Sequence, residues 1–329
     1  MNGKIFLTCA AGLLLSTTAA AQTQRPPFTA VFDDFEDGVI DSAWTVGITL
    51  GALINVEETQ GVLRADGSLL TQSQNGSFQL SRTFSPMSGA FQLDVPLRWA
   101  PDAQDPLGGT SSVTMELLDV HEQPIASWAV DDSNALGAGE IQVVGPTIAH
   151  LIPLQDLQGE GFLRLHRTAN GTLRFTYLGD GGPRTGMLGF VPQEVGGMRI
   201  TFRHSGFGSP PFTTLELESV LLSNDLSPLL HVSPLVAGQS GTLTLYDGTP
   251  LLLMGFAYST TGAGPIVTPF GIAELSLPIS MLPTVAADAT GQATLDMTVP
   301  ASASGRDVWI QGLDFATGVL TPGVKTTIQ

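Results

Sequence analysis

Apolar and polar residues alternate with a period of two over much of the chain. In the segment 91–99 every second side chain is apolar, namely Phe91, Leu93, Val95, Leu97 and Trp99. Segments 198–204 and 214–221 alternate in the same way. Because successive side chains of a strand point to opposite faces, this period is typical of half-buried β-strands. No apolar pattern of period 3.6 lasts three turns, so the sequence predicts an all-β fold.

Turn residues separate the predicted strands where hairpins need them. Polar turns divide 56–63 and 113–130 each into two short strands. In 161–179, GFLRLHRTANGTLRFTYLG, the dipeptide Asn170-Gly171 lies at the centre. Asn-Gly accepts the two positive φ angles of a type I′ turn, whose twist suits two antiparallel strands. We therefore predict a tight hairpin with a two-residue loop at 170–171.

The predicted register of this hairpin decides which side chains share a face. Around a two-residue loop, Arg164 lies opposite Tyr177 and His166 lies opposite Phe175. Five side chains then form one aromatic and cationic face: Phe162, Arg164, His166, Phe175 and Tyr177. In the alternative, Phe175 and Tyr177 pack into the core and the arginines lie along its rim.

The chain changes character near residue 223. Segment 224–228, NDLSP, is a polar joint that contains proline, and 230–329 holds only two cationic residues, Arg306 and Lys325. Beyond the joint, short apolar strands are predicted at 241–246, 251–258, 273–277, 292–299 and 308–313. About 100 residues with this spacing fit a seven-stranded sandwich of immunoglobulin-like type. We expect a first domain at 28–223, a linker at 224–229 and a second domain at 230–329.

The first 21 residues have the pattern of a secretory signal peptide. Lys4 precedes an apolar run that ends in small residues at 19–21, and the run is too short to span a bilayer. Cys9 is the single cysteine, so removal of the signal leaves no disulfide, thiolate ligand or cysteine nucleophile. No later stretch is apolar enough to insert into a membrane. We expect a secreted or cell-surface bacterial protein.

The charge balance narrows the range of partners. The 30 acidic residues outnumber the 13 Lys and Arg, which gives a formal net charge of −17 at pH 7. A chain this acidic repels nucleic acid and anionic membranes. Charged residues make up only 13% of the chain, so its surface is expected to be largely uncharged and polar.

The opening of the mature chain carries a further pattern. Segment 31–44, VFDDFEDGVIDSAW, reads as a buried strand, an acidic turn and a core tryptophan. It resembles the start of concanavalin A-like lectin/glucanase domains, as do the hairpin LRLHRTANGTLRFTYLGDG and the final strand TTLELESVLLS. The resemblance covers about 28–223. It implies a jelly-roll sandwich whose last strand pairs near its first and whose concave face often binds glycans.

Two sites follow as hypotheses. Sugar recognition combines aromatic stacking with a few directed polar groups, and the hairpin face supplies both. We predict a ligand site formed by Phe162, Arg164, His166, Tyr177 and Trp99. Calcium is the one cofactor candidate. Carboxylate oxygens are ligands that suit this ion, and several carboxylates cluster in the acidic turn. The proposed calcium ligands are Asp33, Asp34, Glu36 and Asp37, the alternative being a merely acidic turn.

Signatures of catalysis are missing. Catalytic glucanases of the resembled superfamily carry alternate carboxylates on one strand, whereas Glu116, Asp119 and Glu122 have the wrong spacing and read as a hairpin. Glu216 and Glu218 share a face of one strand, but this alternating pattern is more typical of a solvent-exposed strand face than of a catalytic pair. The five histidines lack metal-site spacing, and no phosphate-binding loop or nucleophile elbow is present.

Three functions remain as hypotheses. The first is a non-catalytic extracellular binding or adhesion protein that binds a glycan or another cell-surface protein. The second is a purely structural cell-surface or matrix protein, and the third is a divergent carbohydrate-active enzyme. Convergent aromatic and polar groups in a groove favour the first, an aliphatic flat face favours the second, and two carboxylates at catalytic separation favour the third.

Overall fold

The structure of the 329-residue chain is a computed structural model. It describes residues 29–33, 40, 42–48, 55–59, 62–66, 76–101, 110–131, 140–153, 159–179, 182–205, 213–217, 219–224 and 226–329. Within these ranges every regular element is a β-strand except the short 3₁₀ helix η1 (Ala301–Ala303). The all-β prediction is confirmed. The proposed signal peptide at 1–21 lies outside the described residues.

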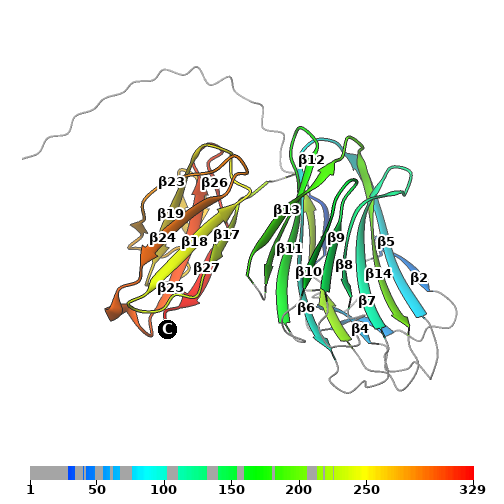
Figure 1. The fold of residues 1–329 in the computed structure, drawn as a ribbon, viewed down its shortest axis with the longest axis horizontal. Coiled ribbons are helices and arrows are strands. Elements are labelled where there is room, and N and C mark those ends of the chain that lie inside the picture. Colours follow the sequence, from blue (N-terminus) through cyan, green and yellow to red (C-terminus); the bar gives the residue numbers. More distant parts are fainter. Residues whose placement is uncertain are drawn as a thin grey trace, which may run out of the picture.

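Strands β1 to β16 form two antiparallel sheets, here called the N-terminal sandwich (Figure 1). The nine-stranded sheet contains β1 (Thr29–Asp33), β3 (Asn55–Thr59), β4 (Val62–Asp66), β6 (Phe91–Pro101), β11 (Gly159–Arg167), β12 (Thr172–Gly179), β13 (Arg184–Phe190), β15 (Thr213–Leu217) and β16 (Val220–Ser223). The seven-stranded sheet contains β2 (Thr45–Ile48), β5 (Gly76–Met87), β7 (Thr110–Asp119), β8 (Pro124–Asp131), β9 (Glu140–Val144), β10 (Ala149–Pro153) and β14 (Val195–Ser205).

The predicted alternation produces the core of this sandwich. Phe91, Leu93, Val95 and Leu97 of β6 are all at most 1% exposed and pack in one apolar cluster with side chains of the facing sheet. Trp128 of β8 lies in the same cluster and is fully buried. Both sheets turn their apolar faces toward one another, so the remaining side chains of each strand face outward.

The segment that opens the N-terminal sandwich pairs with its last strand, as the resemblance to concanavalin A-like domains implies. Strand β1 pairs antiparallel with β16, the last strand of the sandwich, and β16 pairs in turn with β6. Trp44 is 5% exposed and belongs to the core cluster, as predicted. The predicted strand 214–221 is in fact two strands, β15 and β16, which pair with different parts of β6.

The hairpin of β11 and β12 forms where predicted, but its register is shifted by one residue. Arg164 lies opposite Thr176 and His166 opposite Arg174, rather than opposite Tyr177 and Phe175. The loop spans 168–171, where the Gly171 amide donates to the Thr168 carbonyl and only Gly171 has a positive φ, 88°. This is the geometry of a turn followed by a left-handed glycine, not a type I′ turn. A shift of one residue exchanges the faces of a strand.

Strands β17 to β27 form the C-terminal sandwich, a unit with its own core. Its elements are β17 (Leu229–Val232), β18 (Ser240–Tyr246), β19 (Leu253–Ser259), β20 (Ile266–Thr268), β21 (Gly271–Ala273), β22 (Ser280–Met281), β23 (Val285–Ala286), β24 (Ala293–Thr298), β25 (Asp307–Asp314), β26 (Val319–Leu320) and β27 (Val324–Thr327). Strands β17, β18 and β24 form one sheet, and β19 and β25 are central to another. Most of 273–277 is not a strand, contrary to the prediction; a short hairpin, β20–β21, precedes it. An immunoglobulin-like architecture stays a prediction.

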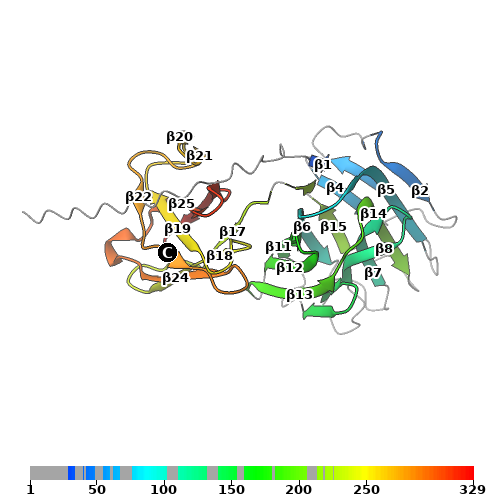
Figure 2. The same cartoon turned by 90° about the horizontal axis from the view of Figure 1, so that it is seen from above.

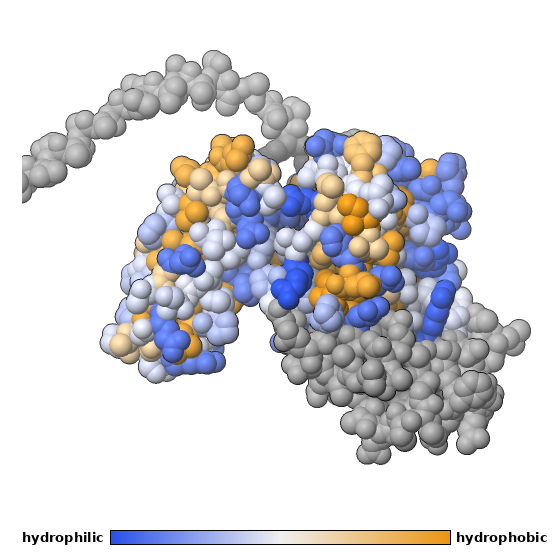
Figure 3. All heavy atoms as spheres, in the orientation of Figure 1, coloured by the Kyte–Doolittle hydropathy of each residue, from blue (hydrophilic) through white to orange (hydrophobic). Residues whose placement is uncertain are grey.

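The apolar clusters of the two sandwiches share no residue. Figure 3 shows apolar and polar residues interspersed over the visible surface of both units, in keeping with the low content of charged residues. Among the described residues, no helix has the length and apolar character needed to cross a membrane.

Candidate ligand-binding site

The predicted aromatic and cationic face is divided between the inside and the outside of the sandwich. Tyr177 is fully buried and Phe175 is 2% exposed, because the shifted register turns both rings into the core. Gly161 and Gly179 leave room for the Tyr177 ring, since a Cβ atom at either position would overlap it. Tyr177 is therefore a core residue, and its prediction as a ligand contact is wrong.

Arg164 faces outward but is not free to bind a ligand. Its guanidinium donates from Nε to Asp94 Oδ1 at 2.7 Å and from Nη2 to Asp94 Oδ2 at 2.8 Å. Nη1 donates to the carbonyl oxygen of Ser227, in the linker, at 2.5 Å. The side chain is 2% exposed. Burial alone would lower the pKa of Arg164, but the neighbouring Asp94 and Asp247 carboxylates raise it, so the group stays charged.

The C-terminal sandwich covers the rest of the cationic surface. Asp247, which follows β18, places Oδ2 3.8 Å from Arg164 Nη1 and Oδ1 3.4 Å from His166 Nδ1. Thr176 Oγ1 lies 3.5 Å from Asp247 Oδ2. Figures 1 and 2 both show β11, β12 and β13 on the side of the N-terminal sandwich nearest to the other unit. Arg164 and His166 are thus interface residues, and their prediction as a ligand site does not fit this geometry.

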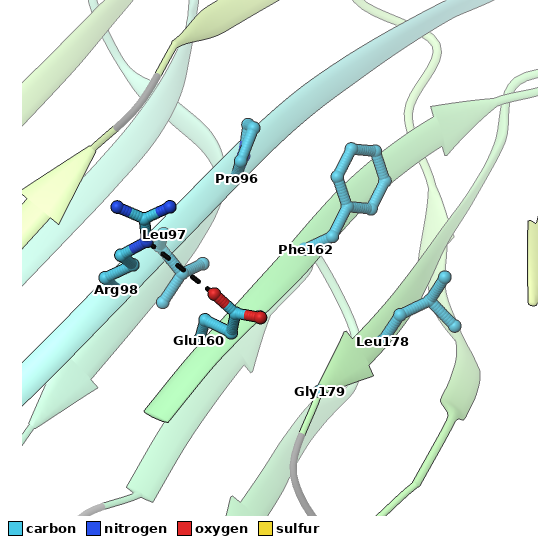
Figure 4. Close-up of a pocket in the computed structure, with 8 residues that line it drawn as sticks. Pro96, Leu97, Arg98, Glu160, Phe162, Leu178 and Gly179 are labelled. Atoms are coloured by element: carbon cyan, nitrogen blue, oxygen red, sulfur yellow. Dashed lines mark ion pairs between the residues drawn. The ribbon is translucent and has the colours of Figure 1, made fainter. Parts of the chain in front are cut away.

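Phe162 does line an open hollow on the outward face of the nine-stranded sheet (Figure 4). Its volume is about 410 Å³. Phe162 lies opposite Pro96 on β6 and Leu178 on β12, which gives the hollow an apolar floor. The Arg98 Nε and Glu160 Oε2 atoms lie 3.6 Å apart beside it, with the two side chains 51% and 78% exposed. Both charged groups can therefore reach a ligand on the floor.

The outward face of the seven-stranded sheet has a different character. Arg199 Nε donates to Glu116 Oε2 at 2.5 Å, and both side chains are partly exposed. Small polar or neutral side chains surround this pair, among them Ser81, Thr114, Ser127, Ala129 and Thr201. Glu116 lies opposite Ser127 and Arg199, so its cross-strand neighbours offer no second carboxylate. Around the Glu116–Arg199 pair, the described part of the face is neither aliphatic nor aromatic.

Asp119 is a turn residue, as the spacing of the acidic residues indicates. Its Oδ1 accepts the backbone N–H groups of His121 at 2.7 Å and Gln123 at 2.9 Å. These bonds, led by that of Gln123, lower the pKa of the exposed Asp119 carboxyl. Its oxygen atoms therefore hold the turn between β7 and β8.

Several predicted site residues fall outside what the structure describes. Trp99 and Asp33 lie in strands β6 and β1, but their side chains are not described. The proposed calcium ligands Asp34, Glu36 and Asp37 lie outside the described residues, as do the side chains of Glu216 and Glu218. Over the described part of the chain, no group of three His, Cys, Asp or Glu side chains could hold a metal ion. The calcium site stays a prediction.

Sequence reasoning missed most of the hollow and all of the interface. Arg98 and Glu160 are 62 positions apart in the chain and meet only because β6 and β11 pair with Arg98 opposite Glu160. Asp247 reads as an ordinary turn residue before a glycine. Only its surroundings in the fold distinguish it, since Arg164, His166 and Arg174 converge on it from the other sandwich.

Comparisons with known proteins give distant similarities only. No protein-family model and no curated protein matches the chain. Among solved structures, the carbohydrate recognition domain of Emp47p is 13% identical, covers 59% of this chain and 94% of its own, and has a TM-score of 0.40. Lectin II from Ulex europaeus is 11% identical, with 60% and 100% covered and a TM-score of 0.38.

One enzyme domain is also similar at this level. The glycoside hydrolase domain of Endo-D from Streptococcus pneumoniae is 12% identical, covers 87% of this chain and 37% of its own, and has a TM-score of 0.29. With identity and TM-score this low, none of these proteins assigns a ligand, a metal or an activity to the chain.

Proposed function

We propose that the chain is a secreted, non-catalytic extracellular protein that binds a glycan in the Phe162 hollow. The observation that carries the proposal is the apolar floor beside two exposed, opposite charges. A sugar ring stacks its C–H face on an aromatic ring and directs its hydroxyl groups to charged side chains at the rim. Phe162 offers the ring, Arg98 offers donors and Glu160 offers acceptors.

The chemistry of the hollow supports binding rather than hydrolysis. Glycoside hydrolysis in most families requires two carboxyl groups on either side of the scissile bond, about 5–9.5 Å apart. Among the described residues that line the hollow, Glu160 is the one carboxylate, and Arg98 lies beside it. A single carboxyl group with an arginine beside it is not the pair of carboxyl groups that this chemistry requires.

A glycan array followed by calorimetric titration of the best neutral oligosaccharide tests the proposal. We expect the full chain to bind with modest affinity. Phe162→Ala should weaken the binding at least tenfold, since it removes the stacking ring. Glu160→Gln should weaken it less, because the amide still accepts one hydrogen bond.

Phe190→Ala is the matched control. Phe190 is an exposed phenylalanine of the same nine-stranded sheet, but it lies in β13 and does not line the hollow. Its substitution should leave the titration unchanged. Binding that survives Phe162→Ala and fails in Phe190→Ala would refute the site, and the absence of any bound glycan would refute the function.

A further inference from the structure

We infer that Arg164 is the centre of a latch that clamps the linker and docks the C-terminal sandwich, so that the two sandwiches keep one orientation. This inference does not depend on the proposed function. It rests on three sets of contacts: those of the linker, those of Asp247, and those of a second turn of the C-terminal sandwich.

The linker is held through both backbone polar groups of one residue, Ser227. Ser227 N donates to Gln92 Oε1 at 3.0 Å, while the Ser227 carbonyl accepts the Arg164 bond at 2.5 Å. Gln92 Nε2 also donates to Asp94 Oδ2 at 3.1 Å, which joins the two halves of the clamp. Gln92 and Asp94 are buried although they lie on the outward face of β6. The linker thus lies against the sheet and cannot act there as a free hinge.

Asp247 supplies negative charge to the cationic surface of β11 and β12. Arg164 is paired with Asp94 within its own sandwich, but Arg174 adds positive charge that Asp94 does not balance, and His166 Nδ1 lies beside Asp247. The Asp247 side chain is only 9% exposed, and its neighbours Arg164, His166 and Arg174 all belong to the N-terminal sandwich. A carboxylate this buried is unfavourable without such partners. The contacts that compensate the burial of the Asp247 carboxylate therefore exist only while the two sandwiches are docked.

A second turn extends the same docking surface. Arg174 Nη1 donates to the carbonyl oxygen of Thr290 at 2.9 Å. The turn that holds Thr290 is tied to the Asp247 turn by a hydrogen bond from Gly248 N to Gly291 O at 3.0 Å. A Cβ atom on Gly291 would overlap the Gly248 carbonyl, so the two turns lie in close contact. Together they contact β11 through Asp247 and β12 through Thr290.

Charge distribution makes this docking directional. Residues 230–329 contain two cationic side chains, Arg306 and Lys325, and neither contacts the interface. The cations of the interface come from β11 and β12, and its second carboxylate comes from the acidic C-terminal sandwich. Such complementarity favours the meeting of these two faces.

Distance measurements between two spin labels test the latch in the full chain. Labels are attached at His121→Cys and Ser280→Cys, which are exposed positions of the two sandwiches, in a Cys9→Ser background that holds no other cysteine. We expect one narrow distance distribution. Asp247→Asn should broaden it and shift its main peak, because the neutral amide no longer balances the cations.

Asp296→Asn is the matched control, since it removes an exposed carboxylate of the same sandwich that binds only Thr242 within that unit. It should leave the distribution narrow. Arg174→Gln changes the interface from the other side and should also broaden it, and circular dichroism melting shows that each variant is folded. A broad distribution in the unsubstituted protein would overturn the latch, as would a narrow one in both Asp247→Asn and Arg174→Gln.

Discussion

Phe162 and Tyr177 lie on neighbouring strands but on opposite faces of the nine-stranded sheet. Tyr177 is fully buried beneath Gly161 and Gly179, whereas Phe162 forms the floor of an open hollow. Truncating a buried aromatic side chain leaves a cavity and loses its apolar contacts. The same change at the surface removes few contacts.

This difference predicts two distinct responses to denaturant. Tyr177→Ala should lower the free energy of unfolding by about 3–5 kcal/mol, and Phe162→Ala by about 1 kcal/mol or less. Urea unfolding followed by circular dichroism measures both values. Equal losses in the two variants would contradict the register of β11 and β12, which places the two rings on opposite faces.

Asp247 gives the interface a dependence on pH. Burial alone would raise the pKa of Asp247, but the neighbouring His166, Arg164 and Arg174 lower it below the ordinary 3.8. A carboxyl group with a depressed pKa stabilises the docked state fully above its ordinary value, and this contribution is lost as the pH falls through the lowered pKa. The docked orientation should therefore persist from neutral pH down to about 3.8 and loosen only below it.

Small-angle scattering across this pH range measures the loosening as a rise in the radius of gyration. Asp247→Asn has no carboxyl group to protonate at this position, so its scattering should change less between pH 5 and the acidic end point. An identical acid response in Asp247→Asn and the unsubstituted chain would assign the effect to other carboxylates.

At the scale of elements, the turn between β11 and β12 sets the faces of the sheet. Gly171 has a φ of 88°, and a Cβ atom there would lie 2.6 Å from the Phe190 ring and 3.1 Å from the Val191 carbonyl oxygen. Gly182 has a similar φ of 81°, but a Cβ atom there would have no neighbour within 4 Å. Both positions favour glycine, and only one is crowded.

The comparison separates backbone strain from steric crowding. Gly182→Ala should cost about 1 kcal/mol through the left-handed conformation alone. Gly171→Ala should cost clearly more, because the Phe190 ring must also move. Thermal unfolding of the two variants measures the difference. Equal melting temperatures would show that the crowding at Gly171 relaxes without cost.

The elements themselves could be predicted from the sequence, but this register could not. Alternation over 91–97 identifies β6 and its buried face, and polar turns locate the β3–β4 and β7–β8 hairpins. Asn170-Gly171 suits two different loops, which differ by one residue in the pairing that follows. This one-residue difference in register decides whether the Tyr177 ring faces outward, toward a ligand, or into the core. Local sequence does not resolve the choice, since burial against the other sheet settles it.

At the scale of the whole molecule, one part of the outward surface of the nine-stranded sheet forms the interface and another part forms the open hollow. Arg164, His166 and Arg174 contact the linker and the C-terminal sandwich, and Phe162 lies beside them in the open hollow. Contacts between distant segments have no local signature, so neither the interface nor the Arg98–Glu160 pair follows from reading the chain. Among the predicted ligand contacts whose side chains the structure describes, Phe162 is the one that lines the hollow.

Hydroxyl-radical footprinting with and without the best oligosaccharide tests the location of the binding site most directly. Phe162 and Leu178 should be oxidised in the free protein and protected by the ligand. Leu151, which is exposed on the edge strand β10 of the seven-stranded sheet, should react equally in both samples. Protection of Leu151 with no change at Phe162 would contradict the account and place the ligand on the seven-stranded sheet.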